Sequence, residues 1–222
     1  IESIDSWGIE KTLNKIAGMF SFAIWDCKKK KLYLARDRLG IKPLYWSIQN
    51  KIFYFGSQPK CFMANKYWKK KIQIKSLLYY FQFGYIAPPN SIFENTFQVQ
   101  PGNYLSIDFK GSYQIKRYWN LNKNINKSKE LFSSSKEYTE RLKDLLGKVV
   151  SQHLISDVPL GAFLSGGIDS SIISLIMCQQ KKNIDTFSVG YNDSSLFDET
   201  EHATKIAKII GSNHTNLQIN PK

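Results

Sequence analysis

A glycine-rich segment between a predicted strand and a predicted helix limits the folds open to this chain more than any other feature. The segment at 164–171 reads L-S-G-G-I-D-S-S. The apolar run before it favours a strand, and the amphipathic run after it favours a helix. The wider pattern predicts, in order, a helix, a strand, a helix, a strand and a helix at 138–154, 158–164, 170–180, 185–189 and 199–210. Because alternating strands and helices build a parallel sheet, this part is predicted to be an α/β domain.

The chemistry of the loop indicates an anion site. Its glycines let the backbone approach a ligand, its serines add donors, and the helix that follows offers free N–H groups and a positive dipole end. Asp169 would repel a phosphate unless it held Mg²⁺. The sequence of the loop matches neither the Walker-type motif GxxxxGK[ST] nor the dinucleotide-binding motif GxGxxG. It also does not match the serine-hydrolase motif G-x-S-x-G, because Phe163 occupies the position of the first glycine. A purely structural turn capped by serines remains the alternative.

The earlier part of the chain predicts antiparallel structure. Strands are expected at 20–26, 32–36, 44–48, 52–55, 104–109 and 113–119, with helices at 9–16 and 74–83. The Asn/Lys/Ser-rich stretch 120–135 is the best linker candidate. We therefore expect an α+β domain at 1–119, a linker at 120–135 and an α/β domain at 136–222.

The net charge and the cysteine content limit the classes of function that are open to this chain. The net charge of +13 leaves nucleic-acid binding open, but only four of the 31 basic residues are Arg, the side chain that base and phosphate recognition favours. We therefore expect no nucleic-acid partner. Three scattered cysteines indicate neither a disulfide framework nor a zinc site. No apolar run reaches the roughly 18 residues of a membrane span, so a cytoplasmic protein is expected.

Taken together, the motifs resemble one family, the glutamine-hydrolysing asparagine synthetases. That family joins a glutaminase domain of the N-terminal-nucleophile type (glutamine amidotransferase type 2) to a PP-loop ATP pyrophosphatase domain. The segments that carry the resemblance are 18–26, 36–45, 84–89, 92–93, 101–105, 163–171, 186–190 and 197–199.

The resemblance implies a reaction and a set of ligands. In the family, aspartate attacks the α-phosphate of ATP to give β-aspartyl-AMP and pyrophosphate, and ammonia from glutamine then displaces AMP. ATP and Mg²⁺ are the implied cofactors, aspartate and glutamine are the substrates, and a homodimer is left open. The residues implied to bind pyrophosphate are Ser165, Gly166, Gly167, Ser170 and Ser171, with Asp169 on Mg²⁺. Those implied to lie near adenosine are Phe163, Leu164 and Val189, although Val189 also fits an ordinary buried strand residue.

The resemblance assigns no catalytic residue to this chain. The family's glutaminase uses a cysteine at the mature N-terminus, where this chain has Ile1, and its late synthetase lysine and acidic residues have no counterpart here. The internal Cys27, Cys61 and Cys178 are better interpreted as structural. Two alternatives stay open: an amidotransferase of the same architecture acting on another carboxylate, for example in surface-glycan or secondary metabolism, and an inactive fragment.

A few polar residues have roles that the sequence leaves undecided. Arg36 and Asp37 fit either a paired turn or a domain interface. Asp198 with Glu201 favours a helix capping box over substrate binding. Gln58 stands where the family often has Glu. The three histidines, His153, His202 and His214, have no metal-ligand spacing and are expected to be surface or packing residues.

Overall fold

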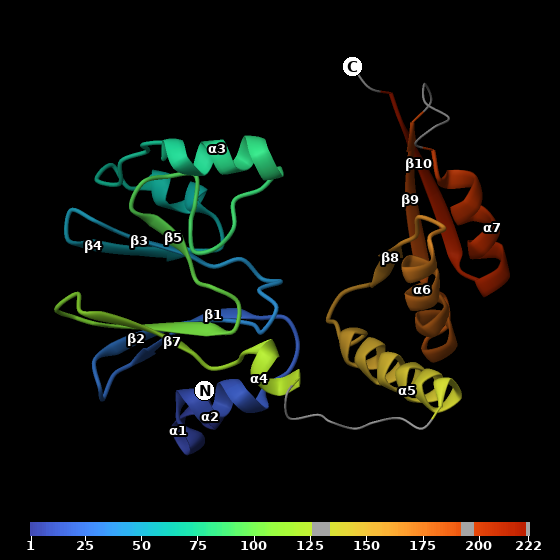
Figure 1. The fold of residues 1–222 in the computed structure, drawn as a ribbon, viewed down its shortest axis with the longest axis horizontal. Helices are drawn as coiled ribbons and strands as arrows, with labels where there is room; N and C mark the ends of the chain where they lie inside the picture. Colours follow the sequence, from blue (N-terminus) through green and yellow to red (C-terminus); the bar gives the residue numbers. More distant parts are fainter. Residues whose placement is uncertain (126–133, 192–197, 221–222) are drawn as a thin grey trace. The chain divides into compact units, whose positions relative to one another are not determined.

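The computed structural model describes residues 1–125, 134–191 and 198–220, and it divides the chain into two compact units, Ile1–Lys129 and Glu130–Lys222 (Figure 1). The helices of unit 1 are α1 (Glu2–Trp7), α2 (Ile9–Lys15), the 3-10 helix η1 (Pro59–Ala64), α3 (Ile74–Phe83) and α4 (Leu121–Ile125). Its strands are β1 (Ser21–Asp26), β2 (Lys31–Arg36), β3 (Tyr45–Gln49), β4 (Ile52–Gly56), β5 (Thr96–Gln98), β6 (Asn103–Asp108) and β7 (Tyr113–Arg117).

Unit 1 consists of two antiparallel sheets stacked face to face between helices. The strand orders are β1-β2-β6-β7 and β4-β3-β5. One core lies between the sheets, where Leu34 and Leu105 meet Trp46. The alternate residues of the first sheet, Tyr33 and Tyr104, pack with Leu13 of α2 on its outer face. Helix α3 lies on the outer side of the second sheet, which gives four layers (Figure 1). The predicted α+β class of this part is confirmed.

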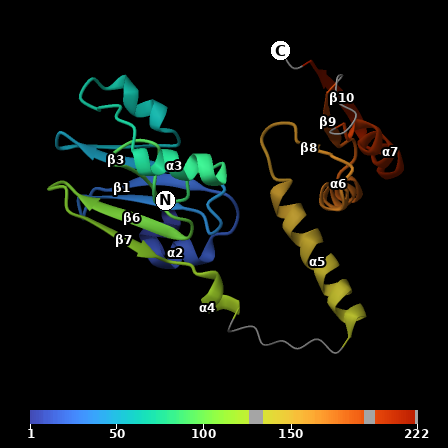
Figure 2. The same ribbon diagram turned by 45° about the horizontal axis from the view of Figure 1, so that its top comes forward.

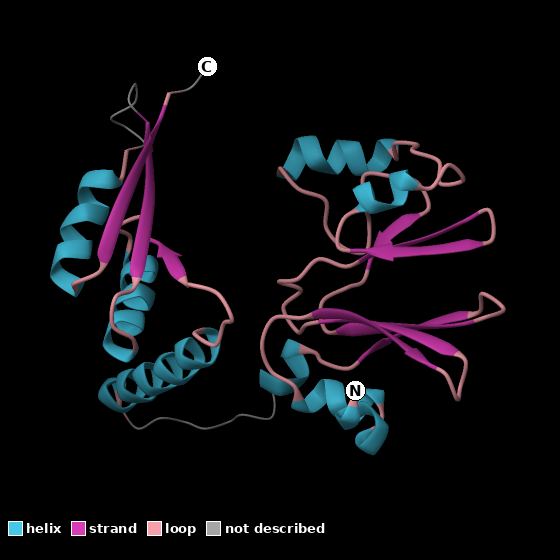
Figure 3. Ribbon diagram, turned by 180° about the vertical axis from the view of Figure 1, so that it is seen from behind, coloured by secondary structure: helices cyan, strands magenta, loops and turns pink. Residues whose placement is uncertain are grey.

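Unit 2 is built on a parallel sheet (Figure 3). Its elements are α5 (Ser135–His153), β8 (Gly161–Phe163), α6 (Ile168–Gln180), β9 (Asp185–Tyr191), α7 (Thr200–Ile210) and β10 (Asn213–Ile219). The strand order is β10-β9-β8, with both pairings parallel. Ala162 of β8 packs with Ile176 of α6, and Leu164 packs with Ala203 and Ala207 of α7. These contacts put α6 and α7 on one face of the sheet, and the predicted α/β class is confirmed.

Several predicted boundaries are wrong. The strand expected at 158–164 covers only Gly161–Phe163, because it pairs with β9 over three residues and Val158 is exposed. Part of the expected linker, Leu121–Ile125, is helical. Helix α5 begins at Ser135 because the Ser134 side chain caps it, accepting a hydrogen bond from Glu137 N. The remainder of the expected linker, 126–133, lies outside the described residues.

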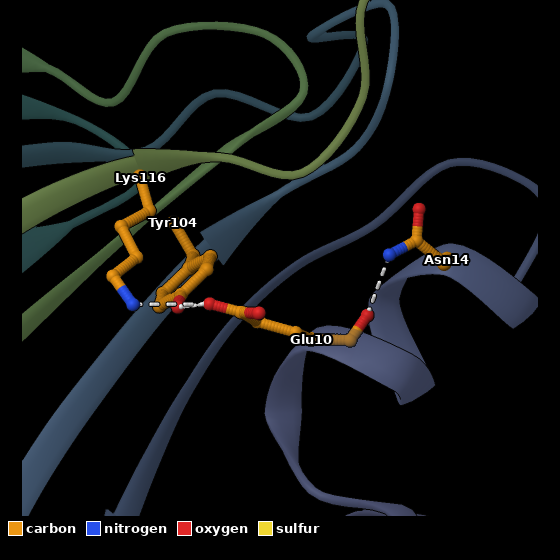
Figure 4. Close-up of polar contacts among 4 residues, drawn as sticks. All are labelled: Glu10, Asn14, Tyr104 and Lys116. Carbon is orange, nitrogen blue, oxygen red and sulfur yellow. Dashed lines mark hydrogen bonds and ion pairs between the residues drawn. The ribbon is translucent and has the colours of Figure 1, made fainter.

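A polar contact holds α2 against the outer face of the first sheet (Figure 4). Tyr104 Oη and Lys116 Nζ donate to Glu10 Oε1 at 2.6 Å and 3.2 Å. The hydrogen bond from Tyr104, followed by the one from Lys116, keeps the pKa of the Glu10 carboxyl below its ordinary value. Burial, and then the hydrogen bond to Glu10, raises the pKa of Tyr104. The sheet and the helix are thus joined through Glu10.

Candidate phosphate-binding site

The glycine-rich loop follows β8 directly and leads into α6, whose N-cap is Gly167. Its serines bond mainly to the loop itself. The Ser165 and Ser170 hydroxyls lie 3.0 Å apart, and Ser165 N donates to Ser170 Oγ at 3.3 Å. The Ser170 and Ser171 hydroxyls both donate to Gly167 O, at 3.1 Å and 2.7 Å. These bonds fix the shape of the loop without any ligand, which lowers the cost of ordering it on binding.

Gly166 has two reasons to be glycine. Its φ of +81° lies in the left-handed region that disfavours a side chain. In addition, a Cβ there would lie 2.7 Å from His202 Cβ and 3.0 Å from Ala203 N, both in the first turn of α7. The second reason depends on contact with a helix 36 residues away along the chain and could not be recognised from the local pattern.

Asp169 has an exposed carboxylate at the start of α6. It is exposed in the first turn of α6, and among the described residues no hydrogen bond or ion pair engages its carboxylate. The described part of the chain holds no group of three or more His, Cys, Asp or Glu side chains suited to a metal. Mg²⁺ is commonly held by one or two carboxylates together with substrate phosphates, so a single free carboxylate beside an anion loop fits that ion.

The three residues expected near adenosine do not share one face of the sheet. Phe163 is 82% exposed and Val189 is 39% exposed, and the register places both on the face that α6 and α7 leave uncovered. The alternative of an ordinary buried residue is therefore wrong for Val189. Leu164 is 1% exposed and faces α7, so its side chain belongs to the core. Phe187 pairs with Phe163 and lies on the same uncovered face. It was not predicted to lie near the adenosine, although its position two residues before Val189 on the same strand places the two side chains on one face.

The capping box expected at Asp198 and Glu201 is not formed. Helix α7 has Glu199 as its N-cap without a side-chain bond. Asp198 Oδ1 instead accepts from Thr200 Oγ1 at 2.6 Å and Thr200 N at 3.0 Å, and these bonds hold the pKa of Asp198 below its ordinary value. Glu201 pairs with Lys205 at 2.6 Å, one helical turn further on. Asp198 is therefore used locally to shape the start of α7.

Arg36 and Asp37 form a buried turn within unit 1. Asp37 is 1% exposed, and its carboxylate accepts hydrogen bonds from the backbone N–H groups of Leu39, Ile41 and Lys42. The Arg36 guanidinium donates to three backbone carbonyls, those of Gly40, Lys42 and Val99. The structure therefore shows a turn in which each of the two side chains bonds to backbone groups, and among the described residues no hydrogen bond or ion pair joins Arg36 to Asp37. Gln58 precedes η1 and lines a groove of about 570 Å³, where nothing in the structure assigns it a role.

The cysteines and histidines take varied places. Cys27 and Cys61 are exposed and Cys178 is half-buried, where burial raises the pKa of its thiol; all three are free. His214 lies between two strand hydroxyls, with Nδ1 2.9 Å from Thr186 Oγ1 and Nε2 3.3 Å from Ser188 Oγ. That arrangement is a packing role. His153 is exposed and bonds to its own helix.

Comparison with known families identifies the two units. Residues 1–119 match the family described as a glutamine amidotransferase domain, which is more than half of the chain. The chain therefore belongs to the glutamine amidotransferases. Residues 141–222 match the family described as asparagine synthase. These two matches, together with the relatives, confirm the resemblance to glutamine-hydrolysing asparagine synthetases.

The relatives match along nearly the whole chain. The glutamine-hydrolysing asparagine synthetase 1 of Bacillus subtilis is 32% identical over 96% of this chain and 33% of its own length. A putative asparagine synthetase 2 of Methanocaldococcus jannaschii is 35% identical over 89% of this chain and 38% of its own. The amidase chry2 of Gibberella zeae is 28% identical over 90% and 31%. The chain thus spans about a third of the length of these relatives.

Two solved structures are also similar. The glutamine phosphoribosylpyrophosphate amidotransferase of B. subtilis, complexed with ADP and GMP, has a TM-score of 0.34 and 17% identity over 94% of this chain and 34% of its own. An allosteric regulatory enzyme of purine biosynthesis has a TM-score of 0.36 and 13% identity over 96% and 49%. Among the described residues, no helix is both long and apolar enough to cross a membrane.

Proposed function

We propose that this chain is part of a glutamine-dependent asparagine synthase, which converts aspartate, ATP and glutamine-derived ammonia to asparagine, AMP and pyrophosphate. The observation that carries the proposal is the loop at 164–171. It joins a parallel strand to a helix, holds its serines in a fixed arrangement and presents a free carboxylate at Asp169. It lies in the region that matches the asparagine synthase family.

The loop residues have distinct parts in this proposal. The loop backbone and the start of α6 bind the β- and γ-phosphates, because a helix N-terminus offers free N–H groups to an anion. Asp169 would hold Mg²⁺, and the ion would supply positive charge against the pyrophosphate that departs. Phe163 and Val189 offer an apolar surface to the adenosine from the uncovered face of the sheet. In the proposed reaction, a carboxylate oxygen attacks the α-phosphorus of ATP and pyrophosphate leaves, because a carboxylate is a poor electrophile until it is adenylated.

A second candidate is amidation of a carboxylate other than that of aspartate. It stays open because one relative that matches 90% of this chain, the amidase chry2 of Gibberella zeae, has a name other than asparagine synthetase. Both candidates use the same loop for ATP. Substrate-dependent release of pyrophosphate, compared between aspartate and other carboxylic acids, distinguishes them.

Calorimetric titration of the chain with ATP and Mg²⁺ tests the shared part of the proposal. The Asp169→Ala variant is expected to bind Mg-ATP at least tenfold more weakly than the wild type, since a charged metal ligand is lost. Asp157→Ala is the matched control, because it removes the same charge from an exposed position before β8 and should bind like the wild type. Equal binding by all three proteins would show that the loop is idle and that the chain is an inactive fragment.

A further inference from the structure

The first turn of α7 lies directly against the phosphate loop. The nearest atoms to a Cβ placed on Gly166 all belong to α7: His202 Cβ at 2.7 Å, and Ala203 N and the His202 carbonyl carbon at 3.0 Å. Behind this contact, Leu164 packs with Ala203 and Ala207 in a buried cluster. The side of the loop next to Gly166 is therefore formed by a second helix, which lies on the same face of the sheet as α6 (Figure 2).

The His202 side chain has no partner in this part of the protein. It is exposed, and among the described residues no hydrogen bond involves its imidazole, whereas Ala203 beside it is fully buried. A histidine carries at least one N–H donor in either protonation state, so its imidazole can donate to an anion without a change of charge. The His202 Cβ lies 2.7 Å from the position that a Cβ on Gly166 would take, so the side chain begins beside the loop.

Two serine hydroxyls and two N–H groups of the loop already have partners within it. The Ser170 and Ser171 hydroxyls donate to Gly167 O. Ser165 N and Gly167 N are directed to Ser170 Oγ and Ser165 Oγ, each at 3.3 Å. Pyrophosphate presents many acceptor oxygens, and an acceptor removed from water without a donor is costly. An uncommitted donor beside the loop therefore has a clear use.

We propose that α7 forms the second wall of the phosphate site and that the His202 imidazole donates a hydrogen bond to a phosphate oxygen held by the loop. The inference rests on the proposed function, because it assigns a further ligand-binding residue to the same site. It gives a ligand-binding role to a residue that the sequence predicts to be a surface or packing residue.

Titration with inorganic pyrophosphate and Mg²⁺, followed by calorimetry, tests the assignment. His202→Phe keeps a ring of similar size without the donor, and it is expected to weaken binding about tenfold, the effect of one hydrogen bond to a charged group. His202→Gln keeps a donor and is expected to stay within about threefold of the wild type. His153→Phe, at an exposed position on α5, is the control and should not change the affinity. Thermal unfolding without ligand checks that each variant is folded.

The outcomes separate the inference from the proposed function. If the wild type binds no pyrophosphate, the proposed function fails and the inference fails with it. If Asp169→Ala loses binding while His202→Phe binds like the wild type, only the inference fails. If His202→Phe and His202→Gln both lose pyrophosphate binding while both remain folded, the hydrogen-bond role is contradicted, because the donor that Gln keeps would then not restore the affinity.

Discussion

At the scale of single residues, the turn after β2 depends on one carboxylate. Asp37 accepts three backbone N–H groups in a place that water does not reach. We expect Asp37→Ala to lower the free energy of unfolding of unit 1 by about 2–4 kcal/mol, because it leaves those donors without acceptors. Urea unfolding followed by tryptophan fluorescence measures this, since all five tryptophans lie in residues 1–119.

Asp26→Ala is the matched control for that prediction. Asp26 also accepts a backbone hydrogen bond in a turn, from Lys29 N; its carboxylate is half-buried and pairs with Lys29, but the bond itself is exposed, so water can replace it. A loss below about 1 kcal/mol is expected there. Equal effects of the two substitutions would mean that burial of the Asp37 turn does not matter to the stability of the unit.

The contact between Tyr104 and Glu10 predicts a pH dependence. Since the folded protein raises the pKa of Tyr104, its contribution is complete below the unfolded pKa of about 10 and is lost as pH rises toward the folded value. Tyr104→Phe should therefore lower the free energy of unfolding by about 1 kcal/mol at neutral pH and flatten its decline above pH 10. Tyr113→Phe, at an exposed position on β7, should change the neutral-pH value by less than about 0.5 kcal/mol. An unchanged alkaline slope in Tyr104→Phe would contradict the assignment.

At the scale of elements, the sequence predicts best where the hydrophobic period is clear. Strands β2 and β3 alternate or run apolar between turn residues and were predicted. Strand β10 was missed because its covered face carries His214 and Asn216, which bond to Ser188 instead of packing as apolar residues. Strand β5 was missed because three residues have no period of their own and become a strand by pairing with β3. The loop was recognisable from its sequence motif. The contact of Gly166 with α7 and the burial of the Leu164 side chain against α7 could not be predicted, because both depend on long-range packing.

Two glycines of unit 2 predict substitutions of opposite sign. Gly147 lies inside α5, and a Cβ there would meet only Gln180 Nε2 at 3.8 Å. Gly147→Ala should therefore stabilise the unit by about 0.5–1 kcal/mol through helix propensity. A Cβ on Gly161 would lie 2.6 Å from Phe187 Cε2 and 2.9 Å from Asp185 O, so Gly161→Ala should push β8 away from β9. Hydrogen exchange of peptides from α6 and β9 should become slower in the first variant and faster in the second; slower exchange in both would refute the predicted clash.

At the scale of the whole molecule, each of the five apolar clusters among the described residues draws its members from one unit. A unit whose core is complete can unfold independently of the other unit, so we expect two unfolding transitions instead of one. Tryptophan fluorescence reports on unit 1, because residues 120–222 contain no tryptophan, while far-UV circular dichroism reports on both. The two signals are therefore expected to have different midpoints.

Thr186→Val tests this separation. The buried Thr186 hydroxyl lies 2.8 Å from Ser212 Oγ and 2.9 Å from His214 Nδ1, so its loss leaves two groups unpaired inside unit 2 and should cost about 1–3 kcal/mol. Thr215→Val makes the same change on the exposed face of β10 and should be nearly neutral. In Thr186→Val, the circular dichroism transition assigned to unit 2 should move to lower urea, while the tryptophan midpoint stays in place. If the tryptophan midpoint moves by the same amount, the two units unfold together, and their cores, although separate in composition, are coupled in stability.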